Sequence, residues 1–193
     1  GDVYKRQAYW SWGLKKANDW RERMGRERNA DWDRMADQMA PWPVVNGVYV
    51  EAESVLEKDG GHPTQLAAYG FLPASAYLDK EVMRKTLRHV LDNWDWADTW
   101  GWDFPLIAMT AIRLNEPEWA LETLLKSVQK NTYLPNGHNF QNEGLPLYLP
   151  GNGGLLTVVA MMCAGWDGCT EGNPGFPKNG LWNVKWEGLK PAF

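Results

Sequence analysis

A short segment rich in tryptophan and aspartate, residues 94–103, lies directly before an apolar, helix-length segment, residues 105–114. The ten residues 94–103 include four tryptophans and three aspartates. A tryptophan ring is a flat apolar plate with one polar N–H group, and an aspartate accepts hydrogen bonds and exchanges protons. Such rings can pack on sugars and such carboxylates can act on glycosidic bonds, so this segment favours a carbohydrate-active site. The other interpretation is a buried aromatic cluster whose aspartates cap the following helix.

The composition is that of a globular chain with an unusual excess of tryptophan. The 193 residues are 44% hydrophobic and 23% charged, and thirteen of them are tryptophan. This length suits one large domain or a piece of a larger one. The net charge of −4 and the absence of a basic patch argue against nucleic acid and against an anionic membrane surface as partners. The longest apolar stretch, residues 155–164, is too short for membrane insertion.

Cysteine and histidine are too few and too scattered for a metal site. Cys163 and Cys169 lie six positions apart, and only three histidines are present. No zinc-type spacing occurs, so we predict no metal and no cofactor, and we expect two free thiols rather than a disulfide. The compartment stays undefined, with the periplasm or the extracellular space compatible with the sequence.

The pattern of apolar residues predicts a chain made mainly of helices. Asn29 and Asp79 are expected to cap helices, Pro41 to end one, and Gly70 to end another. The predicted helices are residues 8–24, 30–39, 63–69, 80–93, 105–114, 117–129 and 152–164. Residues 46–53 predict a turn and a short extended segment, residues 130–151 a long loop, and residues 181–186 a strand.

Two of these helices differ from the others in that they are apolar on nearly every side. Residues 105–114 and 152–164 must be enclosed by other elements, whereas residues 80–93 and 117–129 carry one apolar stripe each. Alternation of enclosed and striped helices suggests two concentric layers. The predicted fold class is therefore all-α, an incomplete (α/α)6 toroid with a short C-terminal β segment.

Acidic residues at two places are the candidates for proton transfer. Glu51 is flanked by Val50 and Ala52 on an extended segment, where burial would raise its pKa and suit it to a general acid; Glu53 on the same strand face is the competing acid. Asp103, at a helix start, could point into a cavity or simply cap the helix. Asp98 is the alternative second carboxylate.

A further set of residues could line a sugar site. Trp100 and Trp102 offer apolar faces, and amide or imidazole groups offer paired donors and acceptors for hydroxyl groups. The candidates are His62, Asn139, Gln141 and Asn152, with His138 beside them. The glycine-rich residues 151–154 could bind an anion such as phosphate at a helix start, although they lack the lysine and the spacing of a P-loop.

The chain resembles glycoside hydrolases with an (α/α)6 barrel, most closely family 95 and more distantly family 65, over residues 46–186. The segment Gly47-Val48-Tyr49-Val50-Glu51-Ala52 falls on the family block that supplies the general acid. The segment from His62 to Tyr69-Gly70-Phe71-Leu72-Pro73 follows the next block, and Trp100-Gly101-Trp102 leads into the apolar helix as in that family. Asp103 stands where the family has serine, and in Pro150-Gly151-Asn152-Gly153-Gly154 proline replaces an aspartate.

The resemblance implies a glycoside hydrolase acting on oligo- or polysaccharides with inversion, with Glu51 as general acid and Asp103 or Asp98 on the water side. It implies that residues 8–165 are the C-terminal half of a barrel, that residues 166–193 lead into a β-domain, and that the missing N-terminal part of the chain completes the site. Residues 1–7 resemble a non-native leader. Two alternatives remain: a phosphorylase like those of family 65, and a carbohydrate-binding α/α domain without catalysis.

Overall fold

The computed structural model describes residues 3–52, 60–73 and 77–192. Two antiparallel two-stranded pairs accompany the helices: β1 (Val44–Val45) with β2 (Val48–Tyr49), and β3 (Thr132–Tyr133) with β4 (Asn139–Phe140). Short 3-10 turns lie at Thr64–Leu66 and Gln129–Asn131. The α-helices are α1 (Val3–Arg23), α2 (Ala30–Asp37), α3 (Ala67–Gly70), α4 (Lys80–Asn93), α5 (Asp103–Arg113), α6 (Pro117–Leu124) and α7 (Leu149–Ala164).

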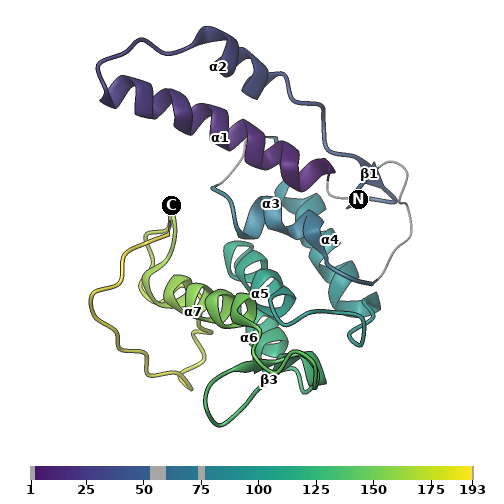
Figure 1. Cartoon of the computed structure of the whole chain (residues 1–193). Coiled ribbons are helices and arrows are strands. Elements are labelled where there is room, and N and C mark those ends of the chain that lie inside the picture. Colours follow the sequence, from purple (N-terminus) through teal and green to yellow (C-terminus); the bar gives the residue numbers. More distant parts are fainter. Residues whose placement is uncertain (1–2, 53–59, 74–76, 193) are drawn as a thin grey trace.

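Helix α5 forms the centre of the body. It packs against α3, α4, α6 and α7 (Figure 1), and each of its eleven residues is buried. Burial of one large apolar side chain stabilises the fold by about 1.5–3 kcal/mol. Because α5 is buried on every side, its apolar side chains stabilise the packing of each neighbouring helix. The prediction that residues 105–114 are enclosed is confirmed, and the helix begins two residues earlier, at Asp103.

Side-chain caps and a tight turn start several elements where the sequence predicted them. The Asn29 side chain accepts hydrogen bonds from the first amides of α2, and Asp79 does the same for α4. The turn between β1 and β2 consists of Asn46 (φ 52°) and Gly47 (φ 81°). Positive φ at both central positions favours the sequence Asn-Gly and matches the twist of a hairpin.

Helices α1 and α2 form an arm at one end of the molecule (Figure 1). The buried Asn18 side chain accepts from the Asn29 amide at 2.8 Å and donates to its carbonyl at 2.9 Å. Arg28 donates two hydrogen bonds to Asp33, at 2.8 and 2.9 Å, and lowers the pKa of that carboxyl to about 2. These contacts join the end of α1 to the start of α2.

A buried guanidinium joins three segments of the body. Arg113 at the end of α5 is 5% exposed and donates to the carbonyls of Tyr69 and Leu72 and, at 3.1 Å, to the carboxylate of Asp167. Burial lowers the pKa of Arg113. The carbonyls and the carboxylate together compensate for the desolvation of this charge.

The predicted fold class is wrong. The described residues are about 48% helical and combine seven α-helices with two small sheets, so the structure is mixed, though largely helical, and these residues form no toroid. The alternation of enclosed and striped helices fails at α7, which leaves Leu149, Leu156 and Val159 exposed. None of the helices in the described ranges has both the length and the apolarity needed to cross a bilayer.

Several predicted boundaries are also corrected. Residues 181–186 form no strand but run as an irregular, mostly exposed segment. The helix predicted over 117–129 ends at Leu124, the predicted loop 130–151 contains the β3–β4 hairpin, and α7 begins at Leu149 rather than at Asn152. Both cysteines are free thiols, as predicted.

Helix α1 begins inside the predicted leader. Residues 1–2 lie outside the described part of the chain, and α1 starts at Val3. Gln7 is buried and donates a hydrogen bond to the Ala40 carbonyl. The boundaries of the predicted domains, near residues 7 and 165, stay predictions.

Two adjacent glycines of α7 test the packing of this helix on α5. A Cβ at Gly154 would meet the Pro105 ring at 2.9 and 3.0 Å, whereas a Cβ at Gly153 would meet nothing within 4 Å. We expect Gly154→Ala to lower the free energy of unfolding by about 1–3 kcal/mol through overpacking. Gly153→Ala should raise it by about 0.5–1 kcal/mol, because alanine is the better helix former. Urea denaturation measures both, and equal effects would contradict the α5–α7 contact.

Candidate functional site

A tight turn at the start of α5 holds Asp103 inside the protein. The Asp103 amide donates to the Trp100 carbonyl at 3.0 Å, and the Trp100 amide donates to Asp103 Oδ2 at 2.8 Å. The Asp103 side chain is fully buried. It is the first residue of α5, where a carboxylate is favoured by the positive end of the helix dipole. The sequence therefore places a buried carboxylate directly beneath the tryptophan-rich turn.

His62 contacts this carboxylate from a different segment. Its Nδ1 lies 3.0 Å from Asp103 Oδ2 and 3.1 Å from Oδ1. The same Nδ1 lies 3.2 Å from Trp102 Nε1, and one nitrogen cannot donate to Asp103 and accept from Trp102 at once. We assign the hydrogen to Nδ1, because a buried carboxylate needs donors more than an indole N–H needs an acceptor. The His62 side chain is 39% exposed, so part of the imidazole lies at the surface beside the buried carboxylate.

Aromatic rings flank the imidazole. The His62 ring centroid lies 5.4 Å from that of Trp102 and 6.0 Å from that of Trp100. The ring centroids of Trp100 and Tyr148 lie 5.5 Å apart, and Lys130 Nζ lies 5.2 Å from the centroid of the Trp100 ring. Since Trp100 and Trp102 are both only partly buried, the cluster presents aromatic surface beside a polar pair.

Glu51 approaches the same segment as His62. Its Oε1 accepts a hydrogen bond from Thr64 Oγ1 at 2.6 Å and a longer one from the Thr64 amide at 3.4 Å. Val50 and Ala52 on either side are buried, while Glu51 itself is half-buried rather than dry. The competing acid, Glu53, lies outside the described residues. The segment from His62 to Thr64 thus contacts both Glu51 and Asp103.

The two aspartates predicted as alternatives occupy different environments. Asp98 is exposed, and its carboxylate lies beside Gly60, where a Cβ would come within 3.1 Å of Oδ2. Asp103 is buried and bonded to His62. The described contacts therefore join Asp103, and not Asp98, to the aromatic cluster.

The amide side chains predicted to bind sugar form a layer beneath the turn. Gln141 is fully buried, accepts from the Gly101 amide at 3.0 Å and donates to Asn139 Oδ1 at 2.8 Å. Asn139 is also fully buried and donates to the Lys130 and Thr132 carbonyls. These groups face backbone atoms rather than solvent.

Asn152 extends this layer into α7. Its Oδ1 accepts from the Asn139 amide at 3.0 Å, and its Nδ2 donates to the Gly137 carbonyl at 2.7 Å. A Cβ at Gly101 or at Gly151 would overlap the Asn139 side chain. Glycine at these two positions allows the turn and α7 to lie directly on the amide layer.

Thr64 and Tyr148 join the cluster although the sequence did not single them out. Thr64 lies two positions after His62, a spacing that could have indicated it. Tyr148 precedes α7 with no local signal, and it is brought in by its ring contact with Trp100. Burial, followed by the charge of Asp103, raises the pKa of Tyr148, so its phenol stays protonated at neutral pH.

Across residues 3–52, 60–73 and 77–192, no group of three or more His, Cys, Asp or Glu side chains could hold a metal ion. His138 is half-buried beside the β3–β4 turn, and its backbone amide donates a hydrogen bond to Asn136 Oδ1 at 3.1 Å. The described cluster therefore offers acid–base groups and aromatic surface.

Comparison of the chain with protein-family models, with curated proteins and with solved structures found no match.

The amide layer can be tested by comparing two glutamines. Gln141→Met keeps the approximate volume but leaves the Gly101 amide and Asn139 Oδ1 without their partner. At about 1–3 kcal/mol for each buried unsatisfied group, we expect a loss of about 2–4 kcal/mol in unfolding free energy. The Gln129 side chain is exposed and donates a hydrogen bond to the Gln141 carbonyl, so Gln129→Met should change the unfolding free energy by about 0.5 kcal/mol or less. Denaturation followed by tryptophan fluorescence separates the two; similar losses would refute the supporting role of Gln141.

Proposed function

We propose that this protein is a glycoside hydrolase whose reacting groups are Glu51 and His62. One observation carries the proposal: a partly exposed imidazole lies between two indole rings with a buried carboxylate behind it, on the segment that also contacts Glu51. The resemblance to family 95 gave Glu51 the role of general acid from the sequence alone. The geometry supports a role for the His62–Asp103 pair beside it.

The indole rings suit the recognition of a sugar. Their faces are apolar and their edges carry an N–H group, so they can pack on the C–H face of a pyranose while its hydroxyl groups stay hydrated or bonded. Lys130 lies over the Trp100 ring, and the ring is only partly buried, so part of its apolar surface stays exposed. Asn139, Gln141 and Asn152 bond within the protein and contribute by fixing the turn.

The reaction assigns one proton transfer to each group. Glu51 donates its proton to the leaving glycosidic oxygen as the bond to the anomeric carbon breaks. Water attacks that carbon, and the His62 imidazole accepts the proton that the water loses. Asp103 is fully buried and does not touch the water, so it is a positioning residue that holds His62 with Nδ1 protonated. Inversion follows if the water reaches the face opposite Glu51.

Hydrolysis is better supported than phosphorolysis. A phosphate site would need open backbone amides at residues 151–154. The Gly151 amide donates to the Tyr148 carbonyl at 3.1 Å, and residues 153 and 154 lie beyond the first turn of α7, where amides bond within the helix. The alternative of a sugar-binding module without catalysis does not require the acid at position 51, so substitution of that residue distinguishes the two.

Glu51→Gln keeps the size of the side chain and removes its proton. With the full chain and oligosaccharides that release reducing sugar, we expect kcat to fall by about 10²–10⁴-fold. The dissociation constant measured by calorimetry should stay within about twofold. Glu143→Gln, at an exposed carboxylate of the 130–151 segment, serves as the matched control with unchanged kcat. Full turnover by Glu51→Gln would reject the acid role, and the absence of both turnover and sugar binding in the unmodified chain would reject the function.

Asp103→Asn tests the positioning role separately from folding. An asparagine can still accept the hydrogen bond from the Trp100 amide, but its neutral oxygen binds the imidazole Nδ1–H less strongly than a carboxylate does. We expect the ¹⁵N chemical shifts of His62 to show the Nδ1–H tautomer in the unmodified protein and a mixture of tautomers in the variant. kcat should fall at least tenfold while KM changes little. Unchanged ¹⁵N shifts would show that Asp103 does not set the tautomer.

A further inference from the structure

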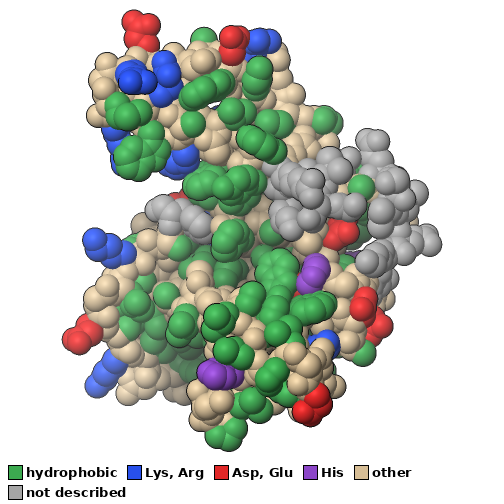
Figure 2. Space-filling view, viewed as in Figure 1, with side chains coloured by type: hydrophobic (Ala, Val, Ile, Leu, Met, Phe, Trp, Pro, Cys, Tyr) green, Lys and Arg blue, Asp and Glu red, His purple; other side chains and the backbone are tan. Residues whose placement is uncertain are grey.

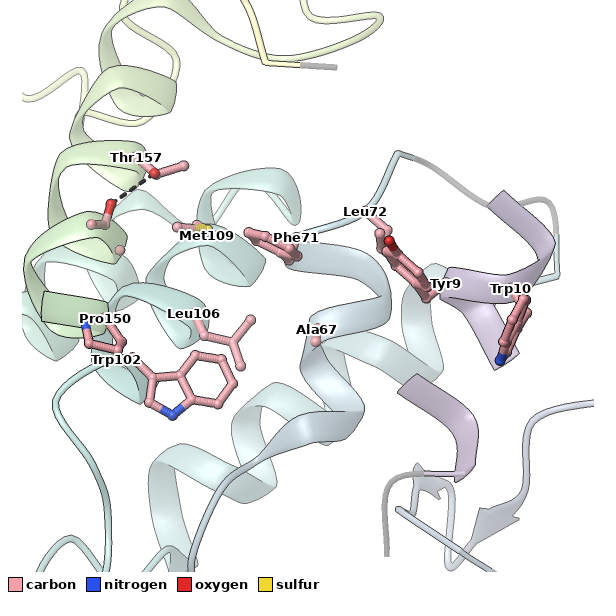
Figure 3. A pocket seen from close by; sticks show the side chains of 12 residues that line it. Tyr9, Trp10, Ala67, Phe71, Leu72, Trp102, Leu106, Met109, Pro150 and Thr157 are labelled. Atoms are coloured by element: carbon pink, nitrogen blue, oxygen red, sulfur yellow. Dashed lines mark hydrogen bonds between the residues drawn. The ribbon is translucent and has the colours of Figure 1, made fainter. Parts of the chain in front are cut away.

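A large apolar cavity lies beside the candidate site. Its volume is about 660 Å³, and it opens between α1, α3, α5 and α7. Figure 3 shows Trp102 and Pro150 on one side of the cavity and Tyr9 and Trp10 on the other, with Leu106 and Phe71 between them. Ligand pockets in proteins have volumes of roughly 300–1,000 Å³, so this cavity has the size of a small-molecule site.

The lining favours a hydrocarbon rather than a polar ligand. Aromatic and aliphatic side chains make up most of the wall, and the Thr157 hydroxyl donates to the Gly153 carbonyl at 2.8 Å instead of facing the cavity as a free donor. Tyr9 and Trp10 are 55% and 60% exposed at its edge. In Figure 2 hydrophobic side chains continue from the α1–α2 arm onto the body below it. Contiguous exposed apolar surface marks a binding surface more often than a solvated one.

Trp102 belongs both to this cavity and to the candidate site. Its ring lines the cavity, while its Nε1 lies 3.2 Å from His62 Nδ1. Trp102 therefore connects the wall of the apolar cavity to the partly exposed His62. A ligand that fills the cavity and extends past Trp102 to His62 must carry an apolar group and a polar group next to each other.

We infer that the cavity binds the alkyl chain of an amphiphilic glycoside whose sugar lies against His62 and Trp100. This inference rests on the proposed function and names its substrate class: glycosides with a hydrocarbon aglycone. The glycosidic oxygen would then lie near Trp102, at the boundary between the two regions.

Binding of n-alkyl β-glucosides tests the inference. Hexyl, heptyl and octyl glucoside, each below its micelle concentration, are titrated into the full chain and followed by calorimetry. Because the head group is constant, the trend with chain length is independent of the preferred sugar. Transfer of each methylene into an apolar site should strengthen binding by about fourfold. An affinity that does not depend on chain length would overturn the inference.

Two leucine substitutions locate the binding site. Gly153 lines the cavity and has open space at its Cβ position, so Gly153→Leu fills the cavity without a clash in the core. This variant should weaken the binding of octyl glucoside by at least tenfold. Gly13 is also helical with nothing within 4 Å of a Cβ and does not line the cavity, so Gly13→Leu is the matched control with unchanged affinity. Equal affinities for both variants would overturn the inference.

Two further measurements separate this inference from the proposed function. Titration of 1-octanol tests the cavity without a sugar. If the protein binds octanol, Gly153→Leu abolishes that binding, and no glycoside is bound or cleaved, then the cavity is a hydrocarbon site and the hydrolase is rejected. Glu51-dependent sugar release without any chain-length effect would retain the hydrolase and reject the inference. Sedimentation equilibrium tests whether a second copy of the chain occupies the cavity. A dimer that Gly153→Leu dissociates would also reject the inference that the cavity binds an alkyl chain.

Discussion

The buried carboxylate of Asp103 is the constraint on which the surrounding structure depends. An unpaired charge inside a protein is strongly unfavourable, so Asp103 must keep its donors. One donor is the Trp100 amide, which closes the turn before α5, and another is His62, which comes from a distant segment. A single desolvated group therefore fixes the helix start, the tryptophan-rich turn and the orientation of the imidazole together.

Local signals in the sequence were sufficient for individual elements but not for the fold class. The caps at Asn29 and Asp79 and the enclosure of residues 105–114 depend on neighbouring residues and could be predicted. The toroid depended on how helices close around each other, which periodicity does not encode. Helix α7 illustrates this: its apolar pattern indicated burial, yet Leu156 is 73% exposed, because a pattern does not specify a covering partner.

The candidate site was predictable in its residues but not in their arrangement. His62, Asp103 and the tryptophans carry chemistry that their residue types already indicate, and the structure places them in contact. Asn139 and Gln141 also have the right chemistry for sugar hydroxyl groups, but both are fully buried and bonded within the protein. Residue type specifies what a side chain can bond, whereas tertiary packing decides which partner it meets. For this reason the sequence could not tell the residues of the aromatic cluster from the buried amides.

Trp102 is the residue at which the two proposals meet, and its amphipathic chemistry explains why. An indole has a polar N–H edge, which here lies 3.2 Å from His62 Nδ1, and an apolar ring, which lines the cavity. A phenylalanine would lose the polar edge, and a polar residue would leave the cavity wall incomplete. Substitution of Trp102 would thus disturb sugar and hydrocarbon binding together. Substitution of Gly153 would affect the cavity alone, and substitution of Glu51 would affect the general acid alone. Variants at those two positions therefore test the substrate class and the reaction separately.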